Sequence, residues 1–311
     1  MGHANVLEIN NLSPFFCRLT AKRRRGYCLP ALGCIHTHPE GSLQVILIGE
    51  LLNSTRKEVR AALEARDTEY VQDLAQRQAK AGVQYIDVNA GAFVDQEIEI
   101  LQWLIRSVRA VTDCPLSIDS PNAEALAVGL KLAGPTALIN SISAESARYE
   151  SVLPLLQKTG APVIALGMDD EGLPDSEEKG FGVIAKLIER LEGDGVARER
   201  IFADPLVRPV GANTTVPPVV LGVIGRVREA FPGVHISGGI SNVSHGMPAR
   251  RLLNRAFLTL CMARGMDAAI VDPLDRRLMA EIAAAELLLG RDEFARNFIN
   301  RHRAGLLEDA P

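Results

Sequence analysis

Polar side chains follow nearly every short apolar segment between positions 45 and 272 of this 311-residue chain. They are carboxylates, carboxamides, hydroxyls and one thioether: Glu50, Asn53, Asp87, Asn89, Asp119, Ser120, Asn140, Ser141, Met168, Asp169, Asp204, Ser241, Asn242 and Asp272. A single Asp or Asn at such a place most often caps a turn. Their recurrence after successive segments favours a shared site. Since carboxylates accept paired N–H donors and carboxamides both donate and accept, the set predicts a site for a neutral, donor-rich heterocycle.

A pterin fits this description, because its pyrimidine edge presents N3–H and a 2-amino group side by side. A phosphorylated ligand would instead require cationic side chains or a nest of backbone N–H groups. Gly238 and Gly239 follow the seventh apolar segment and keep a phosphate-binding lyase open as an alternative. The same glycines equally allow the backbone to approach a flat ring closely.

Several other kinds of chemistry are disfavoured by the residues that are missing from these positions. No lysine directly follows an apolar segment, so a Schiff-base aldolase is not expected. The His36-Thr-His38 pair and Cys34 resemble the start of a metal site. This motif, however, precedes the first expected strand, and no histidine follows the fifth or sixth segment. We therefore expect no bound metal.

The elements that must position the polar residues form a regular alternation. Eight short segments rich in β-branched residues alternate with longer segments of helical periodicity. The expected strands are 45–49, 85–88, 116–118, 137–139, 162–166, 201–203, 234–237 and 268–271. The expected helices lie near 57–81, 95–111, 122–133, 147–159, 177–192, 216–230, 250–264 and 276–288. This order predicts a parallel (β/α)8 TIM barrel of the α/β class, whose strands end at one common mouth.

Composition and charge separate the ends of the chain from this barrel. Residues 1–44 hold five basic and two acidic side chains and three of the five cysteines, and we expect them to be a disordered extension. The barrel is expected over 45–298 and a C-terminal tail over 299–311. The formal net charge of −4 argues against a nucleic-acid partner, and no apolar run is long enough for a membrane. With no secretory signal pattern, the odd cysteine number indicates reduced thiols and a cytoplasmic protein.

The segments at the strand ends resemble those of the methyltetrahydrofolate:corrinoid protein methyltransferases, pterin-binding barrels that also form the folate module of cobalamin-dependent methionine synthase. The resemblance covers about residues 45–298. The matching motifs are IGELLN (48–53), DVNAG (87–91), IDS (118–120), INS (139–141), ADPL (203–206), GGISNVSHG (238–246) and LLNRAFL (252–258).

The resemblance implies roles for individual residues. Asp204 would hold the pyrimidine edge, Asp119 and Asn140 would bond other ring positions, and Asn242 would approach N5, which carries the methyl group. Asn242 and Asp119 are the catalytic candidates. The residues that would complete or shape the pterin site are Glu50, Asn53, Asn89, Ser241 and Gly239. His245, where the family has an amide side chain, Arg250 and Met168 would be neighbours of the site.

The resemblance also implies an activity in one-carbon metabolism and the molecules that take part in it. A methyl group would move between N5 of methyltetrahydrofolate and the cobalt of a corrinoid (cobalamin) carried by a partner protein, and the enzyme would be a homodimer. A dihydropteroate synthase-like enzyme is the nearest alternative, but the lysine signature that such enzymes carry near the seventh strand is absent from HISGGISNVSHG (235–246). A folate-binding subunit without catalytic activity is a third hypothesis.

Overall fold

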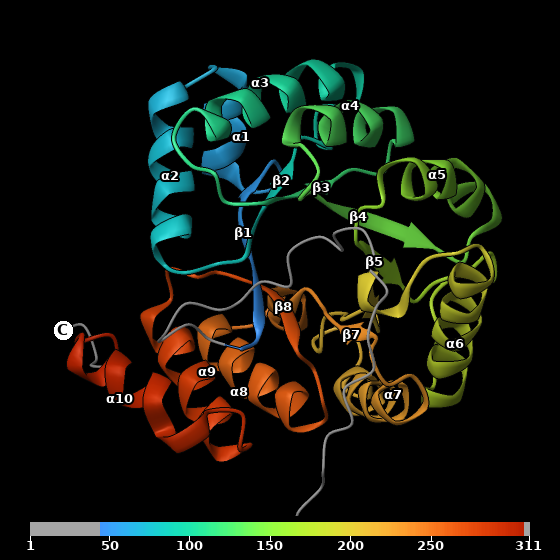
Figure 1. Ribbon diagram of the computed structural model, residues 1–311, viewed down its shortest axis with the longest axis vertical. Coiled ribbons are helices and arrows are strands. Elements are labelled where there is room, and N and C mark those ends of the chain that lie inside the picture. The colour runs from blue at the N-terminus through green and yellow to red at the C-terminus, as the bar shows by residue number, and fades with distance from the viewer. Residues whose placement is uncertain (1–43, 308–311) are drawn as a thin grey trace, which may run out of the picture. The chain divides into compact units, whose positions relative to one another are not determined.

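The computed structural model describes residues 44–307. These residues form eight strands that alternate with helices (Figure 1). The strands are β1 (Ile46–Asn53), β2 (Tyr85–Asn89), β3 (Leu116–Asp119), β4 (Leu138–Ser143), β5 (Val163–Leu166), β6 (Ile201–Asp204), β7 (His235–Ile236) and β8 (Ala268–Val271). The α-helices are α1 (Lys57–Glu64), α2 (Thr68–Lys80), α3 (Glu97–Arg109), α4 (Ala123–Ala133), α5 (Ser146–Thr159), α6 (Glu177–Gly193), α7 (Val216–Ala230), α8 (Arg250–Ala263), α9 (Arg276–Leu288) and α10 (Arg296–Arg303).

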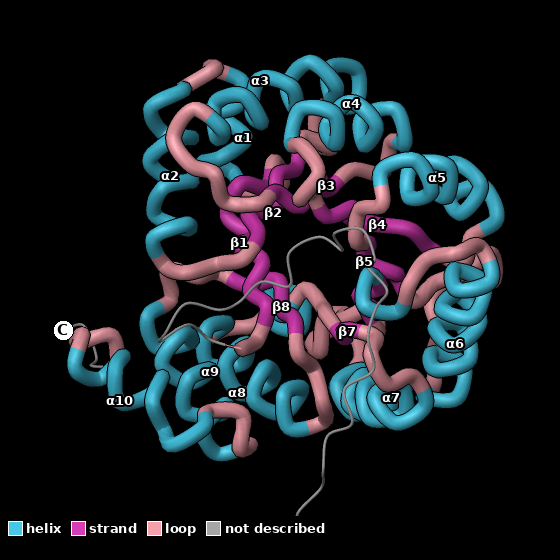
Figure 2. The backbone as a smooth tube through the Cα atoms, in the orientation of Figure 1, coloured by secondary structure: helices cyan, strands magenta, loops and turns pink. Residues whose placement is uncertain are grey.

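All strand pairs are parallel, in the order β7-β6-β5-β4-β3-β2-β1-β8. The ring is completed where the segment after β7 meets β8. Gly239 forms a parallel bridge with Ile270, whose N–H donates to the Gly238 carbonyl at 3.0 Å. The strands therefore lie in the centre with the helices around them (Figure 2). The expected (β/α)8 barrel and each of its eight strands are confirmed.

Alternation along the strands places the polar residues inside the barrel. A separate buried cluster contains one inward apolar residue from each of six strands: Ile48, Tyr85, Leu138, Ile164, Phe202 and Ala268. Side chains of a strand repeat on the same face every second residue. Asp87, Asn140 and Asp204 each lie two residues beyond a member of this cluster, toward the carboxyl end of the strand. They therefore face the interior above its apolar floor.

Two helical expectations were incomplete. The single helix expected near 57–81 is two helices, because Arg66 takes a left-handed conformation with φ of 53° and Asp67 starts a new helix. The Asp67 carboxylate accepts a hydrogen bond from Tyr70 N at 3.1 Å, which is typical of a helix N-cap. The helix α10 was not expected, and it crosses position 298, where the barrel was predicted to end. The domain limits themselves stay a prediction.

The strand β1 is longer than expected and contains an irregularity that displays Glu50. Its pairing with β2 shifts between Gly49 and Leu52, so Glu50 and Asn53 lie within the strand and not in a loop after it. Gln78 of α2, which is fully buried, accepts a hydrogen bond from the Leu51 N–H at 3.1 Å. Gln78 thereby takes the place of the missing ladder partner, as a buried N–H requires.

Replacing Gly49 by alanine should destabilise the fold by about 1–3 kcal/mol. A Cβ at this position would overlap Gln78 Oε1 and would displace the amide from Leu51 N. Urea denaturation measures the change. Gly182→Ala is the control, because no atom lies within 4 Å of its Cβ position and the helix α6 should gain about 0.5–1 kcal/mol. Equal stabilities for Gly49→Ala and the wild type would contradict the role of Gln78 at the irregularity in β1.

Candidate active site

Four inward residues from β2, β3 and β4 form two hydrogen-bonded pairs at the mouth. Asp87 Oδ1 accepts hydrogen bonds from Ser117 Oγ at 2.7 Å and from Asn140 Nδ2 at 3.1 Å. Asn89 Nδ2 donates to Asp119 Oδ2 at 2.9 Å. The strand register explains the contacts, since Asn89 pairs with Asp119 and Asp119 with Asn140. We call Asp87, Asn89, Asp119 and Asn140 the bonded side of the mouth.

The two carboxyl groups of the bonded side are both harder to ionise than usual. Burial raises the pKa of Asp119 to about 6, although the hydrogen bond from Asn89 and the charge of Arg148 lower it. Burial and the neighbouring Asp119 raise the pKa of Asp87 well above its ordinary value. Two close carboxyl groups out of water do not both ionise readily. This side can therefore hold a proton as well as accept hydrogen bonds.

Asn89 also links the bonded side to β1. Its Oδ1 accepts hydrogen bonds from Ser54 Oγ at 2.6 Å and from Gly91 N at 3.1 Å. Ser54 Oγ in turn accepts from Ala92 N at 3.0 Å. All the hydrogen-bonding atoms of the Asn89 amide face protein groups, so its position is fixed by the segments after β1 and β2.

Asp204 lies at the end of β6 with few partners. It is 6% exposed, and its Oδ1 accepts a hydrogen bond from the Leu206 N–H at 2.8 Å. Within residues 44–307 no side chain donates a hydrogen bond to it. Burial raises its pKa to about 7. A buried carboxylate with unused acceptor positions is suited to a ligand that brings its own N–H donors.

The Ser241–Asn242 segment forms the wall opposite the bonded side. It is a 3-10 helix, η3 (Ile240–Ser244), and the Ser241 hydroxyl donates to Glu50 Oε2 at 2.8 Å. Arg250 of α8 donates to Ser244 Oγ at 3.1 Å and to the Ser241 carbonyl at 2.9 Å. Burial raises the pKa of Glu50, against the hydrogen bond from Ser241. Glu50 therefore holds the start of the segment at Ser241, and Arg250 binds both Ser241 and Ser244.

Asn242 itself is exposed at the mouth, and so is His245 at the end of η3. A Cβ on Gly239 would lie 2.9 Å from Asn242 Nδ2, so a larger residue at 239 would push the amide aside. The His245 N–H donates to the Asn242 carbonyl at 3.2 Å. The structure thus leaves the Asn242 amide free to reach a ligand above the barrel.

Two of the expected residues make mainly local contacts. Asn53 Oδ1 accepts from the Thr55 N–H at 3.0 Å and from the Thr55 hydroxyl at 2.7 Å, which closes the turn after β1. The Met168 carbonyl accepts from Ala144 N at 3.0 Å, and its side chain is half-buried beyond β5. The structure does not bring either into the bonded side of the mouth.

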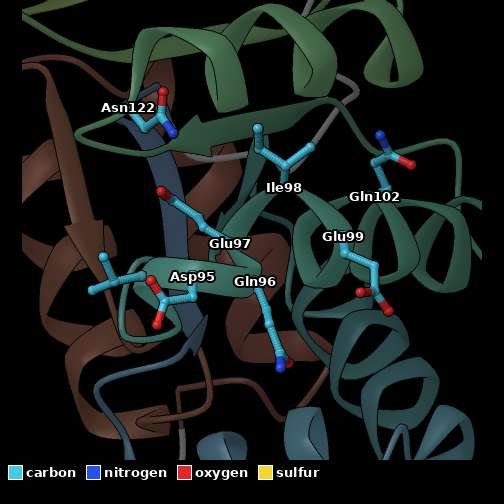
Figure 3. Close-up of a pocket in the computed structure, with 8 residues that line it drawn as sticks. Asp95, Gln96, Glu97, Ile98, Glu99, Gln102 and Asn122 are labelled. Carbon is cyan, nitrogen blue, oxygen red and sulfur yellow. The ribbon is translucent and has the colours of Figure 1, made fainter.

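Two charged residues next to the bonded side were not anticipated. Arg148 of α5 and Glu97 of α3 contact the segment that follows β3, where Ser120 Oγ donates to Glu97 Oε1 at 2.5 Å. Figure 3 shows Glu97 directed toward the segment of Asn122, whereas Gln96 and Glu99 point the other way. Glu97 also lines a cavity of about 340 Å³ with Asn122 and Gln102. Because both residues come from helices and not from strand ends, reading strand ends alone could not find them.

The described residues offer no cluster for a metal. No group of three His, Cys, Asp or Glu side chains in this part of the chain is arranged to hold one. The Cys34, His36 and His38 motif lies outside the described residues. Among the helices of residues 44–307, none is long and apolar enough to cross a membrane.

Comparisons with known proteins identify the family of this chain. The model of the family described as pterin binding enzyme matches residues 49–272. The chain is 35% identical over 263 residues to the methylcorrinoid:tetrahydrofolate methyltransferase of Eubacterium limosum, which covers 84% of this chain and 97% of that protein. It is 28% identical over 246 residues to methionine synthase of Mycobacterium leprae (strain TN), covering 73% of this chain and 20% of the relative.

Solved structures of similar fold include dihydropteroate synthases. The Xanthomonas albilineans enzyme in complex with indole-2-carboxylic acid and 6-chloroguanine has a TM-score of 0.61 at 18% identity, and the alignment covers 81% of this chain and 98% of that one. The same enzyme in complex with 7,8-dihydropteroate has a TM-score of 0.58 at 18% identity, covering 80% and 94%. At this identity the likeness concerns the fold alone.

Proposed function

Because this chain belongs to the family of pterin-binding enzymes, we propose that the mouth of its barrel holds the reduced pterin of tetrahydrofolate between the bonded side and the Asn242 segment. The protein is a methyltransferase that moves a methyl group between N5 of tetrahydrofolate and the cobalt of a corrinoid protein. The observation that carries this function is the 35% identity to the methylcorrinoid:tetrahydrofolate methyltransferase of Eubacterium limosum, which extends over 97% of that protein. The dihydropteroate synthase alternative has only a shared fold in its support.

Asp204 takes the pyrimidine edge in this proposal. Its buried carboxylate has acceptor positions that no side chain of residues 44–307 occupies, and N3–H with the 2-amino group supplies two parallel donors. Asp119 and Asn140, from β3 and β4, bond the remaining polar atoms of the pterin. Ser241, Gly239 and Glu50 shape the wall on the η3 side.

Asn242 acts on N5. Methyl transfer from a neutral tertiary amine has a poor leaving group, and a hydrogen bond that tightens on N5 in the transition state lowers the barrier. The partner's corrinoid, when bound, supplies the cobalt that accepts or donates the methyl group. The chain therefore needs no serine or cysteine nucleophile. Its own residues fix the pterin so that N5 faces the open mouth.

Binding of the pterin should weaken as the pH falls through 7. The pKa of Asp204 is about 7 in the free protein, and the pyrimidine edge requires its carboxylate form. Affinity for methyltetrahydrofolate should be highest above pH 7 and fall by up to about tenfold per pH unit below it. Titration calorimetry between pH 6 and 8 measures the dependence. In Asp204→Asn the fall in affinity through pH 7 should disappear, leaving the smaller fall near pH 6 that follows Asp119. A constant affinity in the wild type would contradict the assignment.

The decisive experiment for the function follows the absorbance of cob(I)alamin with methyltetrahydrofolate, with and without the purified chain. A methyltransferase accelerates the loss of the Co(I) band. A folate-binding subunit without catalytic activity would bind methyltetrahydrofolate and leave the band unchanged. If a phosphorylated ligand raised the thermal unfolding temperature and folates did not, the phosphate-binding lyase alternative would be favoured.

The homodimer and the cytoplasmic location belong to the same proposal. The helix α8 exposes Leu252 and Leu260, at 60% and 53%, eight residues apart on one face with Ala256 between them. Such a face is suited to a second copy of the chain, and light scattering of the purified protein measures its mass. Reduced folate and Co(I) need a reducing compartment, in which Cys114 and Cys261 stay the free thiols that they are here.

A further inference from the structure

Arg148 binds backbone carbonyls on two neighbouring segments of the mouth. Its Nη2 donates to the Ser120 carbonyl at 2.7 Å and its Nη1 to the Pro121 carbonyl at 2.5 Å, both after β3. Its Nε and Nη2 donate to the Ser141 carbonyl in β4, at 2.9 and 2.6 Å. The carbonyls of Ser120 and Ser141 each belong to the residue that directly follows a side chain of the bonded side, Asp119 or Asn140. A planar guanidinium with five donors can join two segments in this way.

Other arginines bind carbonyl pairs, but at the opposite end of the barrel. Arg200 donates to the carbonyls of Leu156 and Ala161, which precede β5. Arg109 and Arg228 do the same next to β3 and β7. These contacts lie at the amino ends of the strands, away from the mouth. Arg200 is therefore a matched comparison for Arg148: a half-buried arginine with the same kind of partners and no part in the site.

The charge of Arg148 also acts on Asp119. The charged or titratable groups around Asp119 are Asp87 from β2, Glu97 from α3 and Arg148 from α5. Burial and Glu97 raise the pKa of Asp119, whereas Arg148 and the hydrogen bond from Asn89 lower it. Among these neighbours Arg148 is the cation, and no hydrogen bond from Arg148 to the Asp119 side chain is formed. Its effect on the carboxylate acts through space.

We propose that Arg148 is a positioning residue of the methyl-transfer site. Its guanidinium fixes the segments after Asp119 and Asn140 to each other, and its charge favours the carboxylate form of Asp119. The link to catalysis rests on the proposed function, because Asp119 matters for activity only if it bonds the pterin. The effect on the titration of Asp119 does not depend on that function.

Three variants separate the effect of the positive charge of Arg148 from that of its hydrogen bonds to the backbone carbonyls. In Arg148→Ala the pKa of Asp119, about 6 in the wild type, should rise by roughly one unit. In Arg148→Lys the charge stays but the bidentate geometry is lost, so the pKa should stay near 6. Arg200→Ala should leave the pKa unchanged. The readout is the ¹³C carboxyl resonance of Asp119 in the free protein, identified by its loss in Asp119→Asn.

Methyltetrahydrofolate affinity supplies the second readout. Arg148→Ala should weaken binding by up to about tenfold at pH 6, and less at pH 8 where Asp119 is ionised in both proteins. Arg148→Lys should weaken binding equally at both pH values. An unchanged titration of Asp119 in Arg148→Ala, or the same binding loss in Arg200→Ala, would overturn the proposal. If the wild type failed to bind methyltetrahydrofolate, the proposed function would fall, while the resonance would still decide the role of Arg148.

Discussion

Replacing Asn242 by alanine should reduce methyl transfer by roughly a hundredfold or more while changing the affinity for methyltetrahydrofolate only slightly. The amide is exposed at the mouth and carries no protein partner that holds it in the described part of the chain. Its hydrogen bond to N5 strengthens as the methyl group leaves, so it stabilises the transition state more than the bound substrate. Single-turnover measurements with cob(I)alamin give the rate, and calorimetry gives the affinity.

An exposed asparagine of α10 offers the control for this experiment. Asn300→Ala removes an amide of the same size from a helix outside the mouth and should leave both quantities unchanged. If Asn242→Ala lost affinity and rate in equal proportion, Asn242 would be a binding residue only. The comparison therefore separates a contact made throughout the reaction from one made in the transition state.

Asp204→Asn should weaken methyltetrahydrofolate binding by roughly a hundredfold, the largest affinity change of any single substitution at the mouth. Asparagine has nearly the same shape, and its Oδ1 can still accept from Leu206 N. Its amide NH2, however, is a hydrogen-bond donor and would face an N–H donor of the pyrimidine edge. Two hydrogen bonds to a charged acceptor are lost, each of which is typically worth about 1.5–3 kcal/mol.

Stability measurements show whether such a loss is a folding defect. The pKa of Asp204 is raised above its ordinary value of 3.8, to about 7, so ionising the buried carboxyl costs folding free energy. This cost grows from pH 4 to 7 and is complete above pH 7. Asp204→Asn should therefore be at least as stable as the wild type at pH 8. Asp73→Asn, on the exposed face of α2, should change neither property. An unchanged affinity in Asp204→Asn would contradict its place on the pyrimidine edge.

The alternation of apolar and helical segments predicted the barrel well because each unit carries its own signal. Every expected strand is present, since a buried strand such as Val163–Leu166 is recognisable from its β-branched run alone. The break at Arg66 was missed because a left-handed arginine leaves no mark on helical periodicity. The helix α10 was missed because it is polar: none of its residues is buried.

The site was predictable where it depends on strand ends and not where it depends on long-range packing. Strand register brings Asn89, Asp119 and Asn140 together, and the sequence already placed them at consecutive strand ends. Gln78 and Arg148 reach the site from helices, through contacts that only the packed structure defines. Asp87 stood among the strand-end residues without an assigned role, although it receives the hydrogen bond from Asn140.

Some residues of the mouth are hydrogen-bonded to each other and others are not, and this difference governs how the effects of substitutions combine. On the bonded side Asp87 is hydrogen-bonded to Asn140 and Asn89 to Asp119, so within each pair the effect of one substitution depends on the other residue. Asp204 and Asn242 share no side-chain hydrogen bond with that side within residues 44–307, and their effects should simply add to it. A new ligand preference can therefore arise at Asp204 or Asn242 one residue at a time. On the bonded side a new preference requires both members of a hydrogen-bonded pair to change together.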